Sequence, residues 1–208
     1  MISEPVMKNE IIKLKTPNLF LRILNNSDAE NLRNLLARNK NFMIPWIPWA
    51  SEEPQSLEKK IQKIQEWKIE FLANQKYTYG IFTPDQKAMI GLIFLFTRQG
   101  KGKLEIGYII DFEESGKGFA TEASYAMTKL GFEHLKIENM VIHCNSKNIA
   151  SAKIPEKLGY QIVQKKMESN IEMLIWSFPK EKFQIIKNFE PVLLLNDKIN
   201  RKRKSLRS

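Results

Sequence analysis

The sequence predicts an α/β fold with a mixed, mostly antiparallel central sheet, one parallel βαβ crossover and flanking helices. The first reason is that short apolar runs alternate with stretches of helical periodicity. The second is a series of runs joined by short turns, at residues 77–83, 88–97 and 104–112, which is typical of an antiparallel meander. The third is a glycine turn and a helical pattern between the runs at 104–112 and 137–145. Strands joined through a helix lie parallel, so these two runs predict a right-handed crossover.

The segment before the meander predicts one strand region and two helices. Residues 11–24 hold two apolar patches, and the alternation in the second predicts a half-buried strand. A helix is expected to start at Ser27, because Glu30 follows three residues later as in a capping box. Residues 56–74 carry apolar side chains at helical spacing, which predicts a long amphipathic helix.

The loop at residues 41–54 contains two Pro-Trp pairs, which exclude a regular helix and favour an extended segment. Trp46 and Trp49 concentrate aromatic surface there. One interpretation is a loop packed on the core. The other is that these two indoles, with Tyr77 and Tyr79, shape a substrate pocket.

The stretch from Asp111 to Gly131 has the order strand end, glycine turn, helix. The turn contains Gly116 and Gly118, and glycine lets the backbone take left-handed dihedral angles and approach a ligand closely. Several backbone N–H groups and the positive end of a helix then point at one spot, which suits a phosphate. The alternative is a simple tight connection between strand and helix.

The C-terminal part predicts a short helix and a last hairpin. The helix is expected at 151–158, where Pro155 is tolerable only near the first turn, and Gly159 ends it. The hairpin is expected at residues 160–166 and 171–178. We therefore expect one domain over residues 1–178 and a partly ordered appendage over 179–208, which ends in a basic tail.

Composition bounds the function class. The formal net charge of the 208 residues is +10, which favours anionic partners without choosing among them. Cys144 is the only cysteine and His134 and His143 are the only histidines, so a disulfide within the chain and a Cys-rich zinc site are excluded and no metal is expected. The N-terminus lacks the features of a signal peptide, and the longest apolar run, at residues 90–96, is strand-sized. We expect a cytoplasmic protein, monomeric or homodimeric, without membrane contact.

Two motifs resemble the GNAT acyltransferases, in particular the branch that contains the RimJ and RimL ribosomal-protein-alanine N-acetyltransferases. They are EIGYIIDFEESGKGFATEA and, further on, NSKNIASAKIPEKLGY. The resemblance covers about residues 14–178 and includes the Pro-Trp-rich loop after the first helix. The family's Q/R-x-x-G-x-G/A motif falls on residues 115–120, where Ser115 departs from it. Since the backbone donors remain, the departure predicts weaker affinity for the cofactor rather than lost binding.

The resemblance implies a GNAT-like fold and acetyl-CoA as co-substrate. The turn at 115–120 would hold the coenzyme A pyrophosphate. The two parallel strands would part after residue 112, and the pantetheine arm would pair with free backbone groups of residues 109–111. The residues expected to contact coenzyme A are Ile109, Ile110, Asp111, Ser115, Gly116, Lys117, Gly118, Phe119, Ala120, Thr121, Asn148 and Ser151.

The resemblance also implies catalytic roles for two residues. Glu105 stands where related enzymes place a general base that acts through water, although an exposed strand carboxylate is the plainer interpretation. Ser151 is the expected proton donor to the leaving thiolate, because the usual tyrosine position falls near Pro155. Asn148 and Ser151 are also good helix caps. A Cys144–His143 nucleophile is a weaker alternative, since adjacent strand residues point to opposite faces.

The leading functional prediction is an N-acetyltransferase that acetylates a protein N-terminal amine by direct transfer in a ternary complex. One alternative acceptor is a small amine, either a polyamine, for which Glu52 and Glu53 are candidate acidic contacts, or an amino sugar. Another alternative is a catalytically degenerate protein associated with the ribosome or with nucleic acid. The basic tail motivates that alternative, and it could equally dock an active enzyme on the ribosome.

Overall fold

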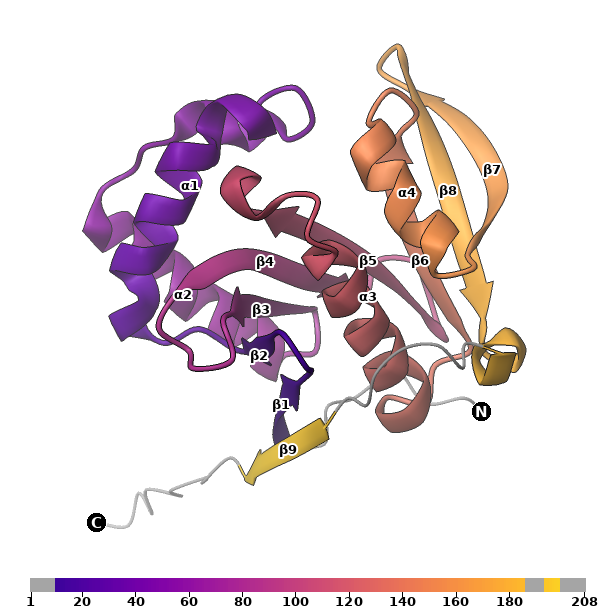
Figure 1. The fold of residues 1–208 in the computed structure, drawn as a ribbon, viewed down its shortest axis with the longest axis horizontal. Helices are drawn as coiled ribbons and strands as arrows, with labels where there is room; N and C mark the ends of the chain where they lie inside the picture. The colour runs from indigo at the N-terminus through magenta and orange to yellow at the C-terminus, as the bar shows by residue number, and fades with distance from the viewer. Residues whose placement is uncertain (1–9, 186–192, 199–208) are drawn as a thin grey trace, which may run out of the picture.

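The structure, a computed structural model, describes residues 10–185 and 193–198. These residues form a nine-stranded sheet in the order β7-β8-β6-β5-β4-β3-β2-β1-β9, flanked by four α-helices (Figure 1). All described neighbours in the sheet are antiparallel except β5 and β6, so the predicted mixed sheet with one parallel crossover is confirmed. The strands are β1 Glu10–Lys15, β2 Phe20–Arg22, β3 Lys76–Phe82, β4 Met89–Phe96, β5 Lys103–Ile110, β6 Asn139–Asn145, β7 Gln161–Glu168, β8 Ile171–Pro179 and β9 Leu193–Lys198.

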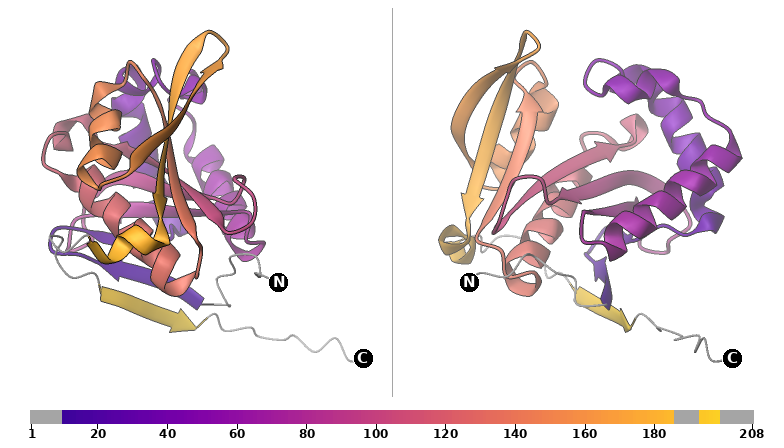
Figure 2. Two further views of the ribbon diagram at one scale, coloured as in Figure 1. Left: turned by 90° about the vertical axis from the view of Figure 1, so that its right-hand side faces the viewer. Right: turned by 180° about the vertical axis from the view of Figure 1, so that it is seen from behind.

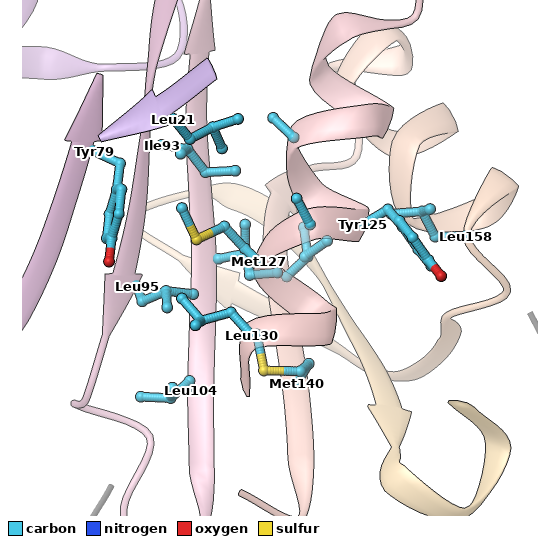
Figure 3. Close-up of a cluster of buried hydrophobic side chains, with 14 of the residues drawn as sticks. Leu21, Tyr79, Ile93, Leu95, Leu104, Tyr125, Met127, Leu130, Met140 and Leu158 are labelled. Atoms are coloured by element: carbon cyan, nitrogen blue, oxygen red, sulfur yellow. The ribbon is translucent and has the colours of Figure 1, made fainter. Parts of the chain in front are cut away.

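The helices divide between the two faces of the sheet, as the ribbon views show (Figures 1 and 2). α1 (Ala29–Met43) and α2 (Leu57–Leu72) share one hydrophobic cluster with β2, β3 and β4. α3 (Phe119–Lys129) and α4 (Ile149–Lys157) cover the other face, over β4, β5 and β6. In Figure 3, Met127 of α3 and Leu130, which follows directly after α3, face the strands that carry Leu95 and Leu104.

Short helical turns complete the fold. They are the 3₁₀ turns η1 Asn26–Asp28, η2 Pro48–Glu52, η3 Phe112–Glu114 and η5 Lys180–Ile185, and the π-helical turn η4 Leu130–His134. Of the helices in the described part of the chain, none has the length and apolar character that crossing a membrane requires.

Two helix starts differ from the sequence-based expectation. Helical structure begins at the turn η1, which leads into α1, and its cap is Asn25 rather than Ser27: Asn25 Oδ1 accepts from Ser27 N, and Asp28 completes the capping box. The expected box was therefore two residues too late, because Asn and Asp at the same spacing cap as well as Ser and Glu. At α4, the helix begins at Ile149 with Asn148 as its cap, which makes Pro155 the seventh helical residue instead of a first-turn residue.

The chain beyond residue 178 contributes further elements to the fold. β8 runs to Pro179, and Phe183 in η5 lies 5.2 Å, ring centre to ring centre, from Phe132. β9 then pairs antiparallel with β1, from Glu10↔Lys198 to Lys15↔Leu193. Part of the expected appendage thus extends the same sheet. Apart from Lys198, the basic tail lies outside the described residues, so its predicted docking on a ribosome stays a prediction.

Candidate functional site

The parallel strands β5 and β6 part from each other halfway along their length. They pair only from Lys103↔Asn139 to Ile106↔Ile142, although β5 continues to Ile110 and β6 to Asn145. Each strand keeps its other neighbour beyond that point, β4 for β5 and β8 for β6. The parting is visible where β6 and β8 diverge from β4 and β5 (Figures 1 and 2). The parting that the resemblance implied is therefore present, but it begins after Ile106 and not after residue 112, because β6 turns away with β8 while β5 stays paired with β4.

The ladder to β4 decides which backbone groups of β5 are free at the parting. Asp111 N donates to Ile90 O in β4, at 2.9 Å. Strand residues alternate in the side to which their N–H and C=O groups point, so Ile109 also faces β4. The groups that point toward β6 are those of Tyr108 and Ile110. Of the predicted stretch 109–111, only Ile110 is placed to pair with an added chain, and Tyr108 joins it.

A cradle of backbone N–H groups, residues 115–121, follows the end of β5. Gly116 and Gly118 have φ angles of 81° and 85°, which a side chain would strain, and Gly118 is the N-cap of α3. Apart from the adjacent residues of the chain, no atom lies within 4 Å of where a Cβ would stand at either glycine, so the space around the cradle is open. The first helical bond runs from Glu122 N to Gly118 O, which leaves the N–H groups of residues 119–121 without an intrahelical acceptor.

The cradle is tied to α1 through Asp111. Its buried carboxylate accepts from Arg38 Nε at 2.6 Å and from Asn39 Nδ2 at 3.1 Å, and Asn39 Oδ1 accepts from Phe112 N at 2.8 Å. Burial would raise the pKa of this carboxyl, but the bonds from Arg38 and Asn39 outweigh burial and lower it. The side chain of Asp111 is therefore an anchor of the cradle and does not face a ligand.

Glu105 lies one residue before the parting, where it pairs with Val141. Its buried carboxylate receives Arg98 Nε at 2.8 Å and Nη2 at 2.5 Å, and Gln99 Nε2 at 2.5 Å. Burial would raise the pKa of Glu105, but these hydrogen bonds outweigh it and the pKa is lowered. The expectation of an exposed strand carboxylate is wrong, because the turn before β5 folds Arg98 and Gln99 over it.

His143 is the first β6 residue beyond the paired stretch. Its Nδ1 is 4.0 Å from Glu105 Oε2, and its Nε2 is buried without a hydrogen-bond partner among the described residues. Cys144 points to the other face, into the cluster under α3, and burial raises the pKa of its thiol. The two side chains thus diverge, and the structure gives no support to a Cys144–His143 nucleophile.

Asn148 and Ser151 meet at the start of α4, on the β6 side of the parting. Asn148 Oδ1 accepts from Ser151 N at 3.0 Å, which is the capping role that the sequence predicted. The Ser151 Oγ is 3.0 Å from the Tyr108 hydroxyl, which reaches it from β5. Sequence reasoning missed Tyr108. The available signal was its spacing of three residues from Glu105 on the same strand. An odd spacing places Tyr108 on the opposite face of the sheet from Glu105, which is the face that α4 covers.

The four predicted substrate-pocket residues are not brought together. Trp46 and Trp49 are 42% and 44% exposed on the α1–α2 side. Tyr77 and Tyr79 are fully buried in the cluster under α3, where their rings lie 5.2 and 6.2 Å from that of Phe71. Strand alternation sends these tyrosines away from the tryptophans, so we do not retain them as pocket residues.

The two acidic residues of the loop at residues 41–54, called here the tryptophan loop, also bond to other residues of the chain. Glu53 is buried and paired with Lys60, which is equally buried, so its assignment as an acidic contact for a polyamine is wrong. Glu52 Oε2 accepts from Gln55 Nε2 at 3.3 Å. In the described ranges, no group of three or more metal-ligating side chains was found.

Comparison with known proteins gives a consistent set of relatives. A family model described as "Acetyltransferase (GNAT) domain" matches residues 18–161. The chain is 28% identical over 150 residues to the probable N-acetyltransferase YjcK of Bacillus subtilis, covering 71% of this chain and 82% of that protein. It is 26% identical over 156 residues to the ribosomal protein uS5-alanine N-acetyltransferase of Escherichia coli, covering 72% and 78%. A crystal structure of a probable acetyltransferase aligns with a TM-score of 0.73 and 26% identity, over 80% of this chain and 95% of that chain.

Proposed function

Since the chain belongs to the GNAT acetyltransferase domain family and is an acetyl-CoA-dependent N-acetyltransferase, we propose that its acceptor is the N-terminal amine of a protein. The transfer is direct, within a ternary complex. The observation that carries the proposal is the parting of β5 and β6 with Glu105 at its closed end and the glycine cradle at the end of β5. The Escherichia coli relative, named for the alanine of a ribosomal protein, supports a protein acceptor.

The residues of the cradle and the parting fit coenzyme A. The open N–H groups of residues 117–121 suit a pyrophosphate, because they sit at a helix N-terminus and need no cationic side chain. Lys117 is bonded to Glu114 at 2.8 Å, so it contributes little free charge. Ile110 and Tyr108 offer backbone groups to the pantetheine arm. Bound acetyl-CoA supplies an acetyl thioester whose C–S bond breaks as the acceptor's C–N bond forms.

Glu105 is the proposed base. An ionised carboxylate at the closed end of the parting can take, through one water molecule, the proton that the acceptor ammonium must lose before it attacks. Arg98 holds that carboxylate in the absence of an acceptor, but its side chain is 62% exposed, so it can leave without becoming a buried, unpaired cation. Ser151, on the other side of the parting, is the proposed donor of a proton to the departing sulfur, and its oxygen regains a proton from the acceptor nitrogen, which loses one as it becomes the amide nitrogen.

The charges around Glu105 disfavour a polyamine. Arg98 and Lys76 both stand over the ring of Phe96, at 4.5 and 5.5 Å from its centre. A polyamine carries several positive charges close together and is repelled by such a pair, whereas a peptide N-terminus brings one. Trp46 and Trp49 offer apolar surface to the residues that follow the N-terminus.

The test is thiol release from acetyl-CoA with matched acceptors. One peptide begins with a free alanine, the second is the same peptide with a blocked N-terminus, and spermidine and glucosamine are the small amines. The proposal expects turnover with the free peptide alone, strongly reduced in Glu105→Gln. Faster turnover with spermidine or glucosamine contradicts the protein acceptor. Binding of acetyl-CoA without turnover of any acceptor would favour the catalytically degenerate alternative.

A further inference from the structure

Helix α4 contains a proline where a helix normally needs an N–H donor. Pro155 is the seventh of its nine residues. In a regular helix the N–H of residue 155 donates to the carbonyl of residue 151, but proline has no N–H and its ring crowds that carbonyl. The carbonyl of Ser151 is therefore left without its helical donor.

Tyr108, from the facing strand β5, supplies the missing donor. Its hydroxyl lies 3.0 Å from Ser151 O and 3.0 Å from Ser151 Oγ. One phenol hydroxyl has one hydrogen, so it donates to one of these oxygens at a time. When Tyr108 donates to the carbonyl, the serine hydroxyl donates to the phenol oxygen. When Tyr108 donates to Oγ, the serine hydrogen is free for a third partner.

We propose that Tyr108 is a positioning residue, which turns the Ser151 hydroxyl toward the departing sulfur by donating to its oxygen. The proposal rests on the role of Ser151 in the proposed function. A hydroxyl that accepts a hydrogen bond becomes a better donor in turn, so the phenol strengthens the contact of Ser151 with the sulfur. Pro155 contributes to this positioning, because it leaves the Ser151 carbonyl without a helical donor, and that carbonyl holds the phenol within reach of both serine oxygens.

Tyr108 keeps its own proton in this role. Burial raises the pKa of the phenol, so the hydroxyl stays protonated throughout the neutral range. No covalent bond to Tyr108 forms or breaks. The residue therefore orients, and a positioning role predicts coupling between Tyr108 and Ser151 rather than an independent effect on the rate.

The first experiment is a double-mutant cycle on kcat. Tyr108→Phe removes the hydroxyl alone, and we expect kcat to fall roughly five- to tenfold, the factor of one ordinary hydrogen bond, with little change in KM for acetyl-CoA. In a Ser151→Ala background, Tyr108→Phe should leave kcat at the level of the single Ser151→Ala variant. Tyr160→Phe is the matched control, because the Tyr160 hydroxyl is also buried but bonds Thr128 Oγ1, at 2.6 Å.

The second experiment measures, without acetyl-CoA, how much the hydrogen bond from Tyr108 to the Ser151 carbonyl stabilises the fold. Tyr108→Phe should lower the urea midpoint of unfolding, since the Ser151 carbonyl loses its only described donor outside the helix. Pro155→Ala restores the helical N–H. In that background the midpoint shift caused by Tyr108→Phe should be clearly smaller.

The outcomes separate the two proposals. If the wild type shows no turnover, the proposed function fails, whatever the urea midpoints show. If the wild type turns over and Tyr108→Phe has the kcat of Tyr160→Phe, the inference is overturned and the proposed function stands. If Tyr108→Phe lowers kcat by the same factor in the wild type and in the Ser151→Ala variant, the inference is overturned too, because the phenol would then act without Ser151.

Discussion

The cradle after β5 is built from backbone groups, whereas the region around Glu105, which we call the acceptor side, is built from side chains. The cradle offers backbone N–H groups and depends on two glycine dihedral angles. The acceptor side depends on side chains: Arg98 and Gln99 on Glu105, Lys76 and Arg98 over an aromatic ring, and, within the tryptophan loop, Glu53 paired with the buried Lys60. In the proposed function, the backbone-built site holds coenzyme A and the side-chain-built site selects the acceptor.

The largest expected effect concerns the buried ion pair of the acceptor side. Lys60→Met leaves the Glu53 carboxylate charged, buried and unpaired, so the free energy of unfolding should fall by about 3–5 kcal/mol. Urea denaturation measures it. Lys63→Met is the control, since its pair with Glu66 is about half exposed and should change stability by less than about 1 kcal/mol. Similar losses for both variants would mean that the pair does not hold the loop.

Glu105→Gln should lower turnover without changing the binding of acetyl-CoA. We expect kcat to fall about 100-fold, as is usual for loss of a general base, while calorimetry finds the affinity for acetyl-CoA unchanged because the cradle is intact.

Arg98→Gln is its companion variant. The pKa of Glu105 is lowered by the Arg98 hydrogen bonds, so their removal raises it, and the acid limb of the pH–rate profile should move to higher pH. A limb that stays in place, or moves to lower pH, would show that Glu105 is not the group that titrates.

Gly118→Ala tests the backbone side, with Gly100→Ala as its match. Both glycines have a φ of 85° and no atom within 4 Å of a Cβ, so both substitutions cost similar stability, about 1–2 kcal/mol. Only Gly118 caps α3. We therefore expect about a tenfold loss of acetyl-CoA affinity for Gly118→Ala alone, if the strain is relieved by movement of the cradle. Equal affinities would refute a cradle set by this dihedral angle.

The smallest expected effect is on stability and concerns Asp111, which ties the cradle to α1. Asp111→Asn should lower the free energy of unfolding by about 1 kcal/mol at pH 7, because Arg38 is partly exposed and weakens the loss. The pKa of Asp111 is lowered in the fold, so this contribution is present above its unfolded value, about 3.9, and is lost as the pH falls through the folded value. Denaturation at pH 7 and pH 3 should show the difference between variant and wild type shrinking in acid. A difference that grows in acid would have the wrong sign.

The parts that the sequence predicted are those fixed by local backbone rules. The crossover, the glycine turn and the Asn148 cap each follow from spacing and residue type within a few positions, and the family motifs support them. The glycines had to stand where positive dihedral angles occur, and strand length had to match the apolar runs.

The parts that sequence reasoning missed depend on contacts between distant segments. Arg38 reaches Asp111 across 73 positions, and Tyr108 reaches Ser151 across 43. Tyr77 and Tyr79 were grouped with Trp46 and Trp49 by residue type, whereas strand alternation put them on the other face of the sheet. A start of α4 two residues earlier changed Pro155 from a tolerated first-turn residue into one that frees a carbonyl.

Amide hydrogen exchange with and without acetyl-CoA tests the backbone-built site most directly. We expect acetyl-CoA to slow exchange at the amides of residues 117–121 and at Tyr108 and Ile110, and to leave α2 unchanged. Unchanged exchange in the cradle, together with protection centred on α2 or the tryptophan loop, would contradict it.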